Sequence, residues 1–441
     1  GSLYSFYQDL KEKQSVSYSA LIKTQDHSIL SLSPELFFKK NRKKIEVRPM
    51  KGTFNRGRDL AHDRLNMSAL RDSLKDRSEN VMIVDLLRND LGRICKPGTV
   101  KATNLFEVER YETLLQMISI VTGSLKKDIG VYDLLKAIFP SGSVTGAPKI
   151  NTMGLINSLE EENRNVYTGG VGFFAPGGKA VFNVAIRTVL IDQRTKEGEM
   201  GIGSGIVYDS NSYKEFEECK LKANFITQQT KHFKLIETLL YKPGKGYFLL
   251  RYHMDRLLES AEYFNFRCDK RYVARELNKL KRCFKGKSSY RVRLLLDKGG
   301  KVELEYTPIA SSYKDEALPK VKFSSQKSFS SDIFLYHKTT ERKLYDDEYK
   351  KWRKRGYFDI IFTNEKKQVT EGAISNIVIK KDRTYYTPPL DAGLLNGVCR
   401  RALFKKKKIS LKEKMLYKKD ICEADELYMI NSVRGMVRVR I

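Results

Sequence analysis

The chain has 441 residues, of which 41% are hydrophobic and 11% aromatic, and this composition is that of a globular protein rather than a disordered one. Its length exceeds the size at which a single hydrophobic core stops growing, so two domains are expected. Lysine and arginine total 82 against 53 aspartate and glutamate, a formal net charge of +29, but the basic residues are scattered and are not interleaved with aromatics. We therefore expect no nucleic-acid partner.

The cysteine pattern and the length of the apolar runs narrow the cellular compartments in which the protein is expected. The six cysteines show no CxxC pair and no zinc-like spacing with the five histidines, which favours reduced thiols. No apolar run is long enough to span a bilayer, so we expect no membrane partner and a cytoplasmic location.

The first half alternates between strand-like and helix-like segments, which predicts an α+β domain with helices covering its sheets. Alternating and turn-bounded patterns predict strands at 19–23, 28–32, 44–48, 169–174, 180–191 and 200–207. Apolar residues at helical spacing predict helices at 64–74, 80–91, from 133 and about 213–230.

A second unit is predicted to begin near residue 233. Its patterns predict strands at 234–241, 290–296 and 302–306, and helices at 252–263 and 271–284. The polar stretch 311–331 is expected to be a linker between two lobes. We therefore predict domains at 3–230 and 233–441.

In the first half, Val47-Arg-Pro-Met-Lys-Gly-Thr53 puts Lys51 between a strand and a Gly-Thr turn whose backbone N–H groups can approach a carboxylate. Alone, this lysine could be an ordinary surface residue. The segment 79–93 places carboxylates along one helix, although Asp85, Arg88 and Asp90 could equally be helix salt bridges.

Two loops rich in small residues add to this pattern. The loop 140–150 ends where a proline can begin a helix, a geometry that binds carboxylates through backbone donors and the helix dipole. A second loop, Gly203-Ser-Gly205, precedes Glu215 and Glu218 on one helix face. Two clusters of oxygen ligands imply a hard divalent ion, most simply Mg²⁺.

The order and spacing of 79–93, 140–149, 167–172 and 203–222 resemble the chorismate-binding enzyme family, which includes anthranilate, aminodeoxychorismate, isochorismate and salicylate synthases. The resemblance covers residues 17–224. It implies that Glu79, Glu215 and Glu218 hold Mg²⁺ and the ring carboxylate of chorismate. The residues implied to surround chorismate are Thr53, Thr145, Tyr167, Arg187, Gly203 and Lys222.

Lys51 separates activities within this family, because anthranilate synthases have alanine there while aminodeoxychorismate synthases use the lysine as a covalent nucleophile. The resemblance thus implies 4-amino-4-deoxychorismate as the product. Two features depart from the family. An earlier strand that relatives carry is missing, so we expect an N-terminally incomplete domain, and Leu115 and Gln116 stand where many relatives have a histidine, which puts proton transfer there in doubt.

In the second half, four segments carry candidate site residues. Arg256 could present a forked donor to phosphate, although its helix could equally be an ordinary amphipathic one. Lys338 ends an apolar stretch where desolvation favours a neutral amine. Glu371 precedes a tight turn, and the helix that starts within 393–400 can receive phosphate at its N-terminus.

These segments, together with 429–435, resemble class IV aminotransferases, and most closely the aminodeoxychorismate lyases fused behind chorismate-using domains. The resemblance implies a two-lobed α/β domain in which Lys338 binds pyridoxal 5'-phosphate covalently and Glu371 pairs with the pyridine nitrogen. The residues implied to hold the phosphate are Arg256, Gly397, Val398, Cys399 and Ser432.

Together the two halves predict an enzyme that aminates chorismate and then eliminates pyruvate to give 4-aminobenzoate for folate. No glutaminase arrangement of cysteine and histidine is visible, so ammonia is expected from a separate glutamine amidotransferase. Two alternatives stay open. The second half could be an amino-acid transaminase, or the first half could be a degenerate binding or regulatory module.

Overall fold

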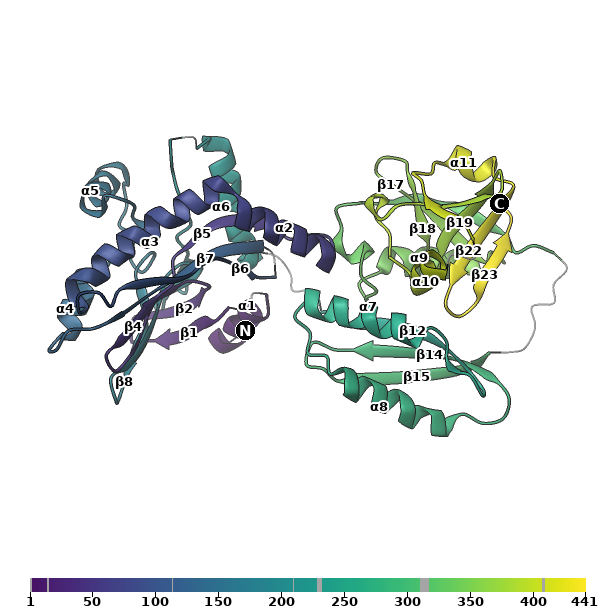
Figure 1. Cartoon of the computed structure of the whole chain (residues 1–441), viewed down its shortest axis with the longest axis horizontal. Coiled ribbons are helices and arrows are strands. Elements are labelled where there is room, and N and C mark those ends of the chain that lie inside the picture. The colour runs from purple at the N-terminus through teal and green to yellow at the C-terminus, as the bar shows by residue number, and fades with distance from the viewer. Residues whose placement is uncertain are drawn as a thin grey trace. The chain divides into compact units, whose positions relative to one another are not determined.

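A computed structural model of the chain describes residues 2–13, 16–112, 114–208, 210–227, 232–309, 317–406 and 409–441. The chain divides into two compact units, one made of Gly1–Arg56 and Arg64–Thr230 and the other of Gly57–Asp63 and Lys231–Ile441. Each unit has its own sheets and helices (Figure 1). The predicted boundary at 230 lies outside the described residues. Within the described ranges, no helix has the length and apolar character needed to cross a membrane.

The first unit contains two sheets. The smaller has the order β1-β2-β10-β11, with β1 (Tyr18–Lys23), β2 (His27–Ser33), β10 (Thr188–Asp192) and β11 (Gly198–Glu199). The larger has the order β5-β7-β4-β3-β9-β8, with β6 also paired to β7. Its strands are β3 (Leu36–Asn41), β4 (Lys44–Val47), β5 (Met50–Asn55), β6 (Lys101–Arg110), β7 (Leu114–Ser124), β8 (Gly170–Ala175) and β9 (Lys179–Val184).

The helices described in this part of the chain are α1 (Leu3–Lys13), α2 (Leu60–Asp72), α3 (Leu74–Ile94), α4 (Val131–Ile138), α5 (Lys149–Leu159) and α6 (Ser212–Thr227). The first four residues of α2 belong to the second unit. Helix α3 begins at Leu74 because the Ser73 hydroxyl accepts a hydrogen bond from the backbone N–H of Asp76. Its buried residues Ile83, Leu87, Leu91 and Ile94 recur every three or four positions and therefore form one stripe.

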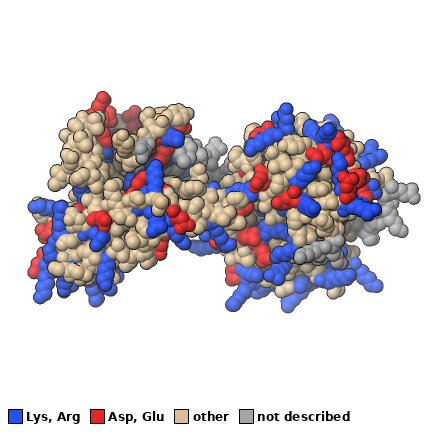
Figure 2. Space-filling view, turned by 45° about the horizontal axis from the view of Figure 1, so that its top comes forward, with Lys and Arg blue, Asp and Glu red and all other residues tan. Residues whose placement is uncertain are grey.

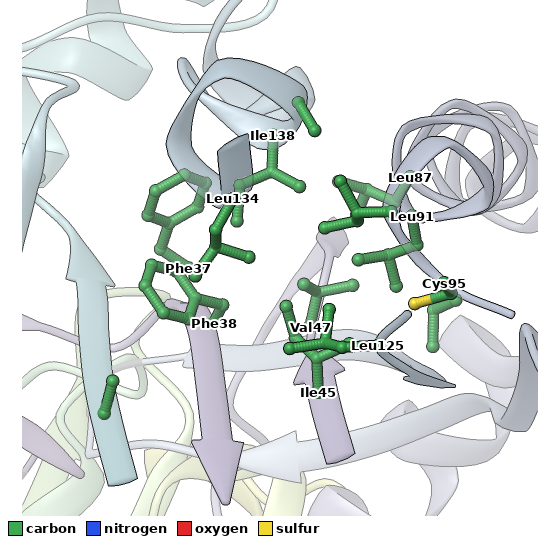
Figure 3. Close-up of a cluster of buried hydrophobic side chains, with 14 of the residues drawn as sticks. Phe37, Phe38, Ile45, Val47, Leu87, Leu91, Cys95, Leu125, Leu134 and Ile138 are labelled. Atoms are coloured by element: carbon green, nitrogen blue, oxygen red, sulfur yellow. The ribbon is translucent and has the colours of Figure 1, made fainter. Parts of the chain in front are cut away.

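That stripe forms the main core of the first unit. Leu87 and Leu91 of α3 and Leu134 of α4 pack above Ile45 and Val47 of β4 (Figure 3). The strand alternates exposed or half-buried residues with buried ones, so its apolar side chains all face the helices. The core thus fixes α3 against the sheet that carries Lys51.

Two predicted strands of the first unit are wrong. Residues 200–207 form no strand, because glycines at 201, 203 and 205 make this segment a loop. The predicted strand 180–191 is two strands, β9 and β10, which belong to different sheets. The chain turns between them at Arg187, whose φ of 49° lies in the left-handed region.

The second unit contains three sheets. One has the order β13-β12-β14-β15, with β12 (Leu235–Lys242), β13 (Gly246–Tyr247), β14 (Ser289–Leu296) and β15 (Val302–Ile309). Another has β16 (Val321–Ser328), β17 (Asp359–Asn364) and β18 (Val369–Gly372). The third has the order β21-β20-β19-β22-β23, with β19 (Asn376–Lys381), β20 (Thr384–Thr387), β21 (Leu411–Glu413), β22 (Glu426–Asn431) and β23 (Gly435–Val439).

The helices of the second unit are α7 (Leu250–Tyr263), α8 (Lys270–Leu280), α9 (Lys343–Arg353), α10 (Val398–Lys406) and α11 (Lys418–Cys422). Leu257 of α7 and Val273 and Leu277 of α8 pack with Val292 and Leu294 of β14 in one core. The linker predicted at 311–331 is only partly tested, since 311–316 lie outside the described residues. The part from Val321 to Ser328 is not a linker but β16, which pairs in parallel with β17.

A short segment from the first half of the sequence belongs to the second unit. Residues Gly57–Asp63 group with it, and the Tyr263 hydroxyl donates a hydrogen bond to the Gly57 carbonyl at 2.6 Å. The imidazole of His337, next to Lys338, lies 3.2 Å from the Arg58 carbonyl, and Arg58 also forms an ion pair with Asp391. The second unit is therefore built from two separate stretches of sequence.

Charged side chains of both signs lie on the face shown in Figure 2. Acidic and basic side chains are intermixed over much of this face rather than sorted into a basic stripe.

The core of the first unit predicts one stability effect. Leu91→Ala, at a side chain that is 0% exposed, should lower the free energy of unfolding by about 2–5 kcal/mol, because it leaves a cavity under α3. Urea unfolding followed by far-UV circular dichroism measures this, while fluorescence of the single tryptophan, Trp352, follows the second unit. Leu65→Ala, at a side chain 64% exposed, is the matched control. A loss no larger than that of the control would show that the α3 stripe does not carry this unit.

Candidate functional site

Lys51 lies on a β-bulge of β5. Met50 pairs with Ile118 and Thr53 with Gln116, so Lys51 and Gly52 together face one residue of β7. Gly52 has a φ of +93°, and a Cβ at this position would lie 2.9 Å from Asp76 Cβ on α3. The bulge therefore depends on Gly52. The bulge changes the direction in which the Lys51 side chain leaves the strand.

The loop 201–205 brings three predicted site residues together. A Cβ on Gly203 would lie 2.7 Å from the Tyr167 hydroxyl, and one on Gly205 would lie 2.8 Å from Lys51 Nζ. Lys222 Nζ donates a hydrogen bond to the Gly203 carbonyl at 2.9 Å. Glycines are needed here because the loop backbone approaches these polar groups too closely for larger residues.

A buried carboxyl, Glu35, lies within electrostatic range of Lys51 and was missed by the sequence analysis. It sits between β2 and β3, and the Ser143 hydroxyl donates a hydrogen bond to it at 2.5 Å. Burial raises the pKa of Glu35 to about 7, although Ser143 and Lys51 act in the opposite direction. A glutamate in Ser-Pro-Glu-Leu-Phe-Phe, directly before a buried apolar run, was the signal that could have identified it.

Thr145 and Arg187 lie on other elements of the same unit. The Thr145 hydroxyl donates to the Ser141 carbonyl at 3.0 Å and so closes the short helical turn that holds Ser143. Burial lowers the pKa of Arg187, which Tyr111 partly offsets. Within the described residues, neither Thr145 nor Arg187 hydrogen-bonds to Lys51 or to the glycine loop, so the structure does not join them to that group.

The three predicted metal carboxylates lie on two helices. Glu79 lies on α3. Hydrogen bonds from Ser204 and Ser210 lower the pKa of Glu215 on α6, and Glu218, on the same helix, forms an ion pair with Lys222 at 2.7 Å. In the part of the chain that the structure describes, no three His, Cys, Asp or Glu residues are grouped closely enough to share an ion. The role of these three carboxylates in binding Mg²⁺ therefore stays a prediction.

In the second unit, by contrast, all of the predicted cofactor residues line one cavity. Its volume is about 940 Å³, within the range of small-molecule sites. The residues that the sequence placed here are Arg256, Lys338, Glu371, Gly397, Val398, Cys399 and Ser432. They come from α7, from β18, from the segment before α9, from the start of α10 and from the residue after β22.

Lys338 is held by its backbone and tuned by its surroundings. Its carbonyl accepts a hydrogen bond from the Ile236 N–H at 2.8 Å, which ties it to the end of β12. Burial lowers the pKa of Lys338 to about 7, and the nearby guanidinium groups of Arg342 and Arg256 act in the same direction. A substantial fraction of this amine is therefore neutral at neutral pH.

Arg256 is fixed by a buried carboxylate. Glu237 accepts two hydrogen bonds from its guanidinium, at 2.8 and 2.7 Å, and lies 2.6 Å from His253 Nδ1. Burial alone would raise the pKa of Glu237, but Arg256 and His253 outweigh it and hold this pKa at about 2. The sequence analysis missed Glu237, although a lone carboxylate inside an apolar strand was a visible signal.

Glu371 and Gly397 meet through Asn376. Asn376 Nδ2 donates to Glu371 Oε2 at 3.2 Å and to the Leu395 carbonyl at 2.8 Å, while a Cβ on Gly397 would lie 2.0 Å from Asn376 Oδ1. Burial raises the pKa of Glu371 to about 8. Gly397 directly precedes α10, and the N-terminus of a helix favours an anion.

This donor set fits pyridoxal phosphate. The cavity is lined by the Lys338 amine, whose pKa is about 7, by the buried carboxyl of Glu371 and by the Arg256 guanidinium. The N-terminus of helix α10 also lies at this cavity. Ser432, whose hydroxyl donates to the Thr238 carbonyl at 3.1 Å, lies at the same wall. Arg291 and Arg293 also line the cavity, because β14 alternates and turns these two away from the core. The sequence analysis did not assign these two arginines.

Comparisons with known proteins match the chain to two families in succession. Residues 1–228 match the chorismate binding enzyme family and residues 234–441 the amino-transferase class IV family. Aminodeoxychorismate synthase component 1 of Salmonella typhimurium is 40% identical over 51% of this chain and 49% of its own length. Anthranilate synthase component 1 of Saccharolobus solfataricus is also 40% identical, over 51% of this chain and 53% of its own length.

Among solved structures, a branched-chain aminotransferase of Thermoproteus uzoniensis is 22% identical, with a TM-score of 0.42, over 47% of this chain and 77% of that chain. The chain thus spans about half the length of the two curated relatives named above. Their equal identity means that overall similarity does not choose between the two amination products.

The glycine loop predicts a specific loss of function. Gly205→Ala should reduce chorismate consumption roughly 10- to 100-fold, because the new methyl group must displace Lys51 Nζ from its position. The flexible lysine can move aside, so the melting temperature should change little. Gly154→Ala in α5 is the control, because a Cβ at Gly154 would have no other atom within 4 Å. Gly177 also has open space around it, but its φ of +76° would strain an alanine. Unchanged consumption in Gly205→Ala would mean that the position of Lys51 is not critical.

The Lys338 environment predicts a titration. In the cofactor-free protein, acetylation of Lys338 should rise through a midpoint near pH 7, since only the neutral amine reacts and burial disfavours its charged form. Arg342→Ala should move the midpoint upward by removing a positive neighbour. Peptide mass spectrometry after competitive acetylation measures both, with the exposed Lys419 as an internal reference. A midpoint above pH 9 would contradict the burial of this amine.

Proposed function

Because the chain belongs to the chorismate-binding enzyme family and carries a class IV aminotransferase domain behind that region, we propose that it makes 4-aminobenzoate from chorismate in two steps. The first unit aminates chorismate to 4-amino-4-deoxychorismate. The second unit removes pyruvate from that intermediate. The observation that carries the proposal is that each unit holds one lysine within a candidate site. Lys51 lies on a β-bulge and faces a glycine loop, and Lys338 lines the candidate cofactor cavity.

In the first step, the Lys51 side-chain nitrogen forms a bond to a ring carbon of chorismate, the ring double bonds shift, and the bond from C4 to its hydroxyl breaks. The hydroxyl leaves as water and needs a proton. Glu35 is suited to supply it, because a carboxyl with a pKa of about 7 is partly protonated at neutral pH. Ammonia then forms a bond to C4, and Lys51 leaves the ring with its electron pair.

The remaining predicted residues of the first unit would hold the substrate. Arg187 is a desolvated guanidinium suited to a carboxylate, and Thr145 directly follows the short helical turn Gly142–Val144. Tyr167, Gly203 and Lys222 form one contact group around the glycine loop, to which Thr53 would add a hydroxyl from the bulge. This set suits a ring with two carboxylates.

Magnesium and ammonia are separate requirements of the proposal. The family resemblance implies Mg²⁺ dependence, with Glu79, Glu215 and Glu218 as the residues that would hold the ion. Within the described residues these carboxylates do not form a cluster, so the chemistry above rests on Lys51 and Glu35. Ammonia would come from a separate glutamine amidotransferase. The purified chain should therefore use ammonium salts but not glutamine.

In the second step, the residues of the cavity have distinct tasks. Arg256, Ser432 and the backbone from Gly397 to Cys399 would hold the phosphate, and Glu371 would face the pyridine nitrogen. Pyridoxal phosphate, when bound, supplies an electron sink. The amine of Lys338, neutral in part at pH 7, would take the ring proton, and loss of the side chain as pyruvate makes the ring aromatic. Arg291 and Arg293 suit the carboxylates of this intermediate.

Two substitutions separate the steps. Lys51→Ala should abolish chorismate consumption and leave pyridoxal phosphate binding unchanged, because the two lysines lie in different units. Lys338→Ala should leave consumption intact and let aminodeoxychorismate accumulate. Mass-resolved product analysis with chorismate, ammonium, magnesium and pyridoxal phosphate measures both, and omission of magnesium or of the cofactor tests each requirement.

Lys44→Ala and Lys301→Ala, at exposed lysines of the two units, are the matched controls. Formation of 4-aminobenzoate by either active-site variant at the normal rate would overturn the role of that lysine. Unchanged chorismate with the intact protein would favour a first half that serves as a binding or regulatory module. Amino-group transfer to a keto acid, without release of pyruvate, would assign the second half to transamination.

A further inference from the structure

The bulge at Lys51 leaves a backbone group without its usual partner. Between the pairs Met50–Ile118 and Thr53–Gln116, two residues of β5 face Met117 alone. A ladder interrupted in this way cannot satisfy every N–H and C=O group from the neighbouring strand. A side chain must supply what the strand does not.

Gln116 of β7 supplies it. Its Nε2 donates a hydrogen bond to the Gly52 carbonyl at 3.0 Å, and its Oε1 accepts one from the Thr53 hydroxyl at 3.2 Å. One carboxamide thus engages both residues that follow Lys51. Because it donates and accepts at the same time, it fixes the orientation of the bulge and not only its distance from β7.

From these contacts we infer that Gln116 is a positioning residue for Lys51: it locks the bulge so that the lysine amine points toward the glycine loop at Gly205. The inference deepens the proposed function, because it rests on Lys51 as the nucleophile. Gln116 acts through the backbone of Gly52 and the side chain of Thr53. It carries no titratable group, so its hold on the bulge stays the same while Glu35 gains or loses its proton.

The charged neighbours of this position are also defined. Glu109 of β6 pairs directly with Gln116 across the ladder, and it interacts with the Tyr111 hydroxyl at 2.9 Å and with Arg48 at 4.0 Å. Lys51 is on β5, and Asp76 of α3 lies beside Gly52. A carboxylate placed at 116 would be repelled by Glu109 and Asp76 and attracted by Lys51 and Arg48.

Three substitutions test the inference. Gln116→Leu keeps the size and removes both hydrogen bonds, so the kcat for chorismate consumption with ammonium should fall roughly 10- to 100-fold while KM changes by less than about 3-fold. Gln116→Glu loses the donor when ionised but regains it when protonated. Its activity relative to the unsubstituted protein should therefore rise as pH falls toward 5. The same ratio for Gln116→Leu should stay flat.

Gln25→Leu, at an exposed glutamine of the turn between β1 and β2, is the control for the substitution itself. The pH-dependent rescue is measured within one folded protein, so it remains informative if Gln116→Leu fails to fold. A kcat within 2-fold of normal in Gln116→Leu, or a flat pH ratio in Gln116→Glu, would overturn the positioning role. Normal activity in Lys51→Ala would instead overturn the proposed function, whatever Gln116 does.

Discussion

Desolvation of ionisable side chains is the constraint around which both units are organised. Taking a charged group out of water is costly unless a partner compensates or the group becomes neutral. Arg256 and Glu237 follow the first course, in a buried bidentate pair. Glu35, Lys338 and Glu371 follow the second, since burial moves the pKa of each toward neutrality. The same burial that raises the cost of folding produces groups that can exchange protons near pH 7.

The two units differ in how many of their candidate site residues are already brought together. In the second unit, the core of β14, α7 and α8 positions a cavity whose donors already converge, and the Glu237 pair holds Arg256 before any phosphate arrives. In the first unit, Lys51 lies on a bulge of β5, whereas Glu218 of α6 is paired with Lys222, and no three carboxylates among the described residues form a cluster.

The sequence was informative where chemistry follows a short local motif. The resemblance of the segments around Lys338, Glu371 and Gly397 to class IV aminotransferases predicted residues that share one cavity, although they lie on different elements. It was less informative where burial depends on distant strands. Glu35 and Glu237 look like ordinary carboxylates in the sequence, and their environment comes from sheets assembled from remote segments.

The errors in secondary structure have similar causes. The loop 200–207 carries Ile202, Ile206 and Val207, which read as a strand, but its glycines and its approach to Tyr167 prevent regular pairing. Strand β16 was missed because its exposed polar residues resemble a linker, and only its parallel pairing with β17 reveals it. In both cases long-range contacts outweighed local pattern.

The segment Gly57–Asp63 has a consequence for how such a protein can be divided or recombined. The two units are interleaved along the chain, because this segment lies between two stretches of the first unit yet packs with the second. A fragment that begins at residue 232 would lack the Gly57 carbonyl that Tyr263 contacts and the Arg58 carbonyl beside His337. Exchange of the second unit with that of a homologue would therefore have to include these seven residues as well. The two units are thus not modules that can be exchanged by one cut in the sequence.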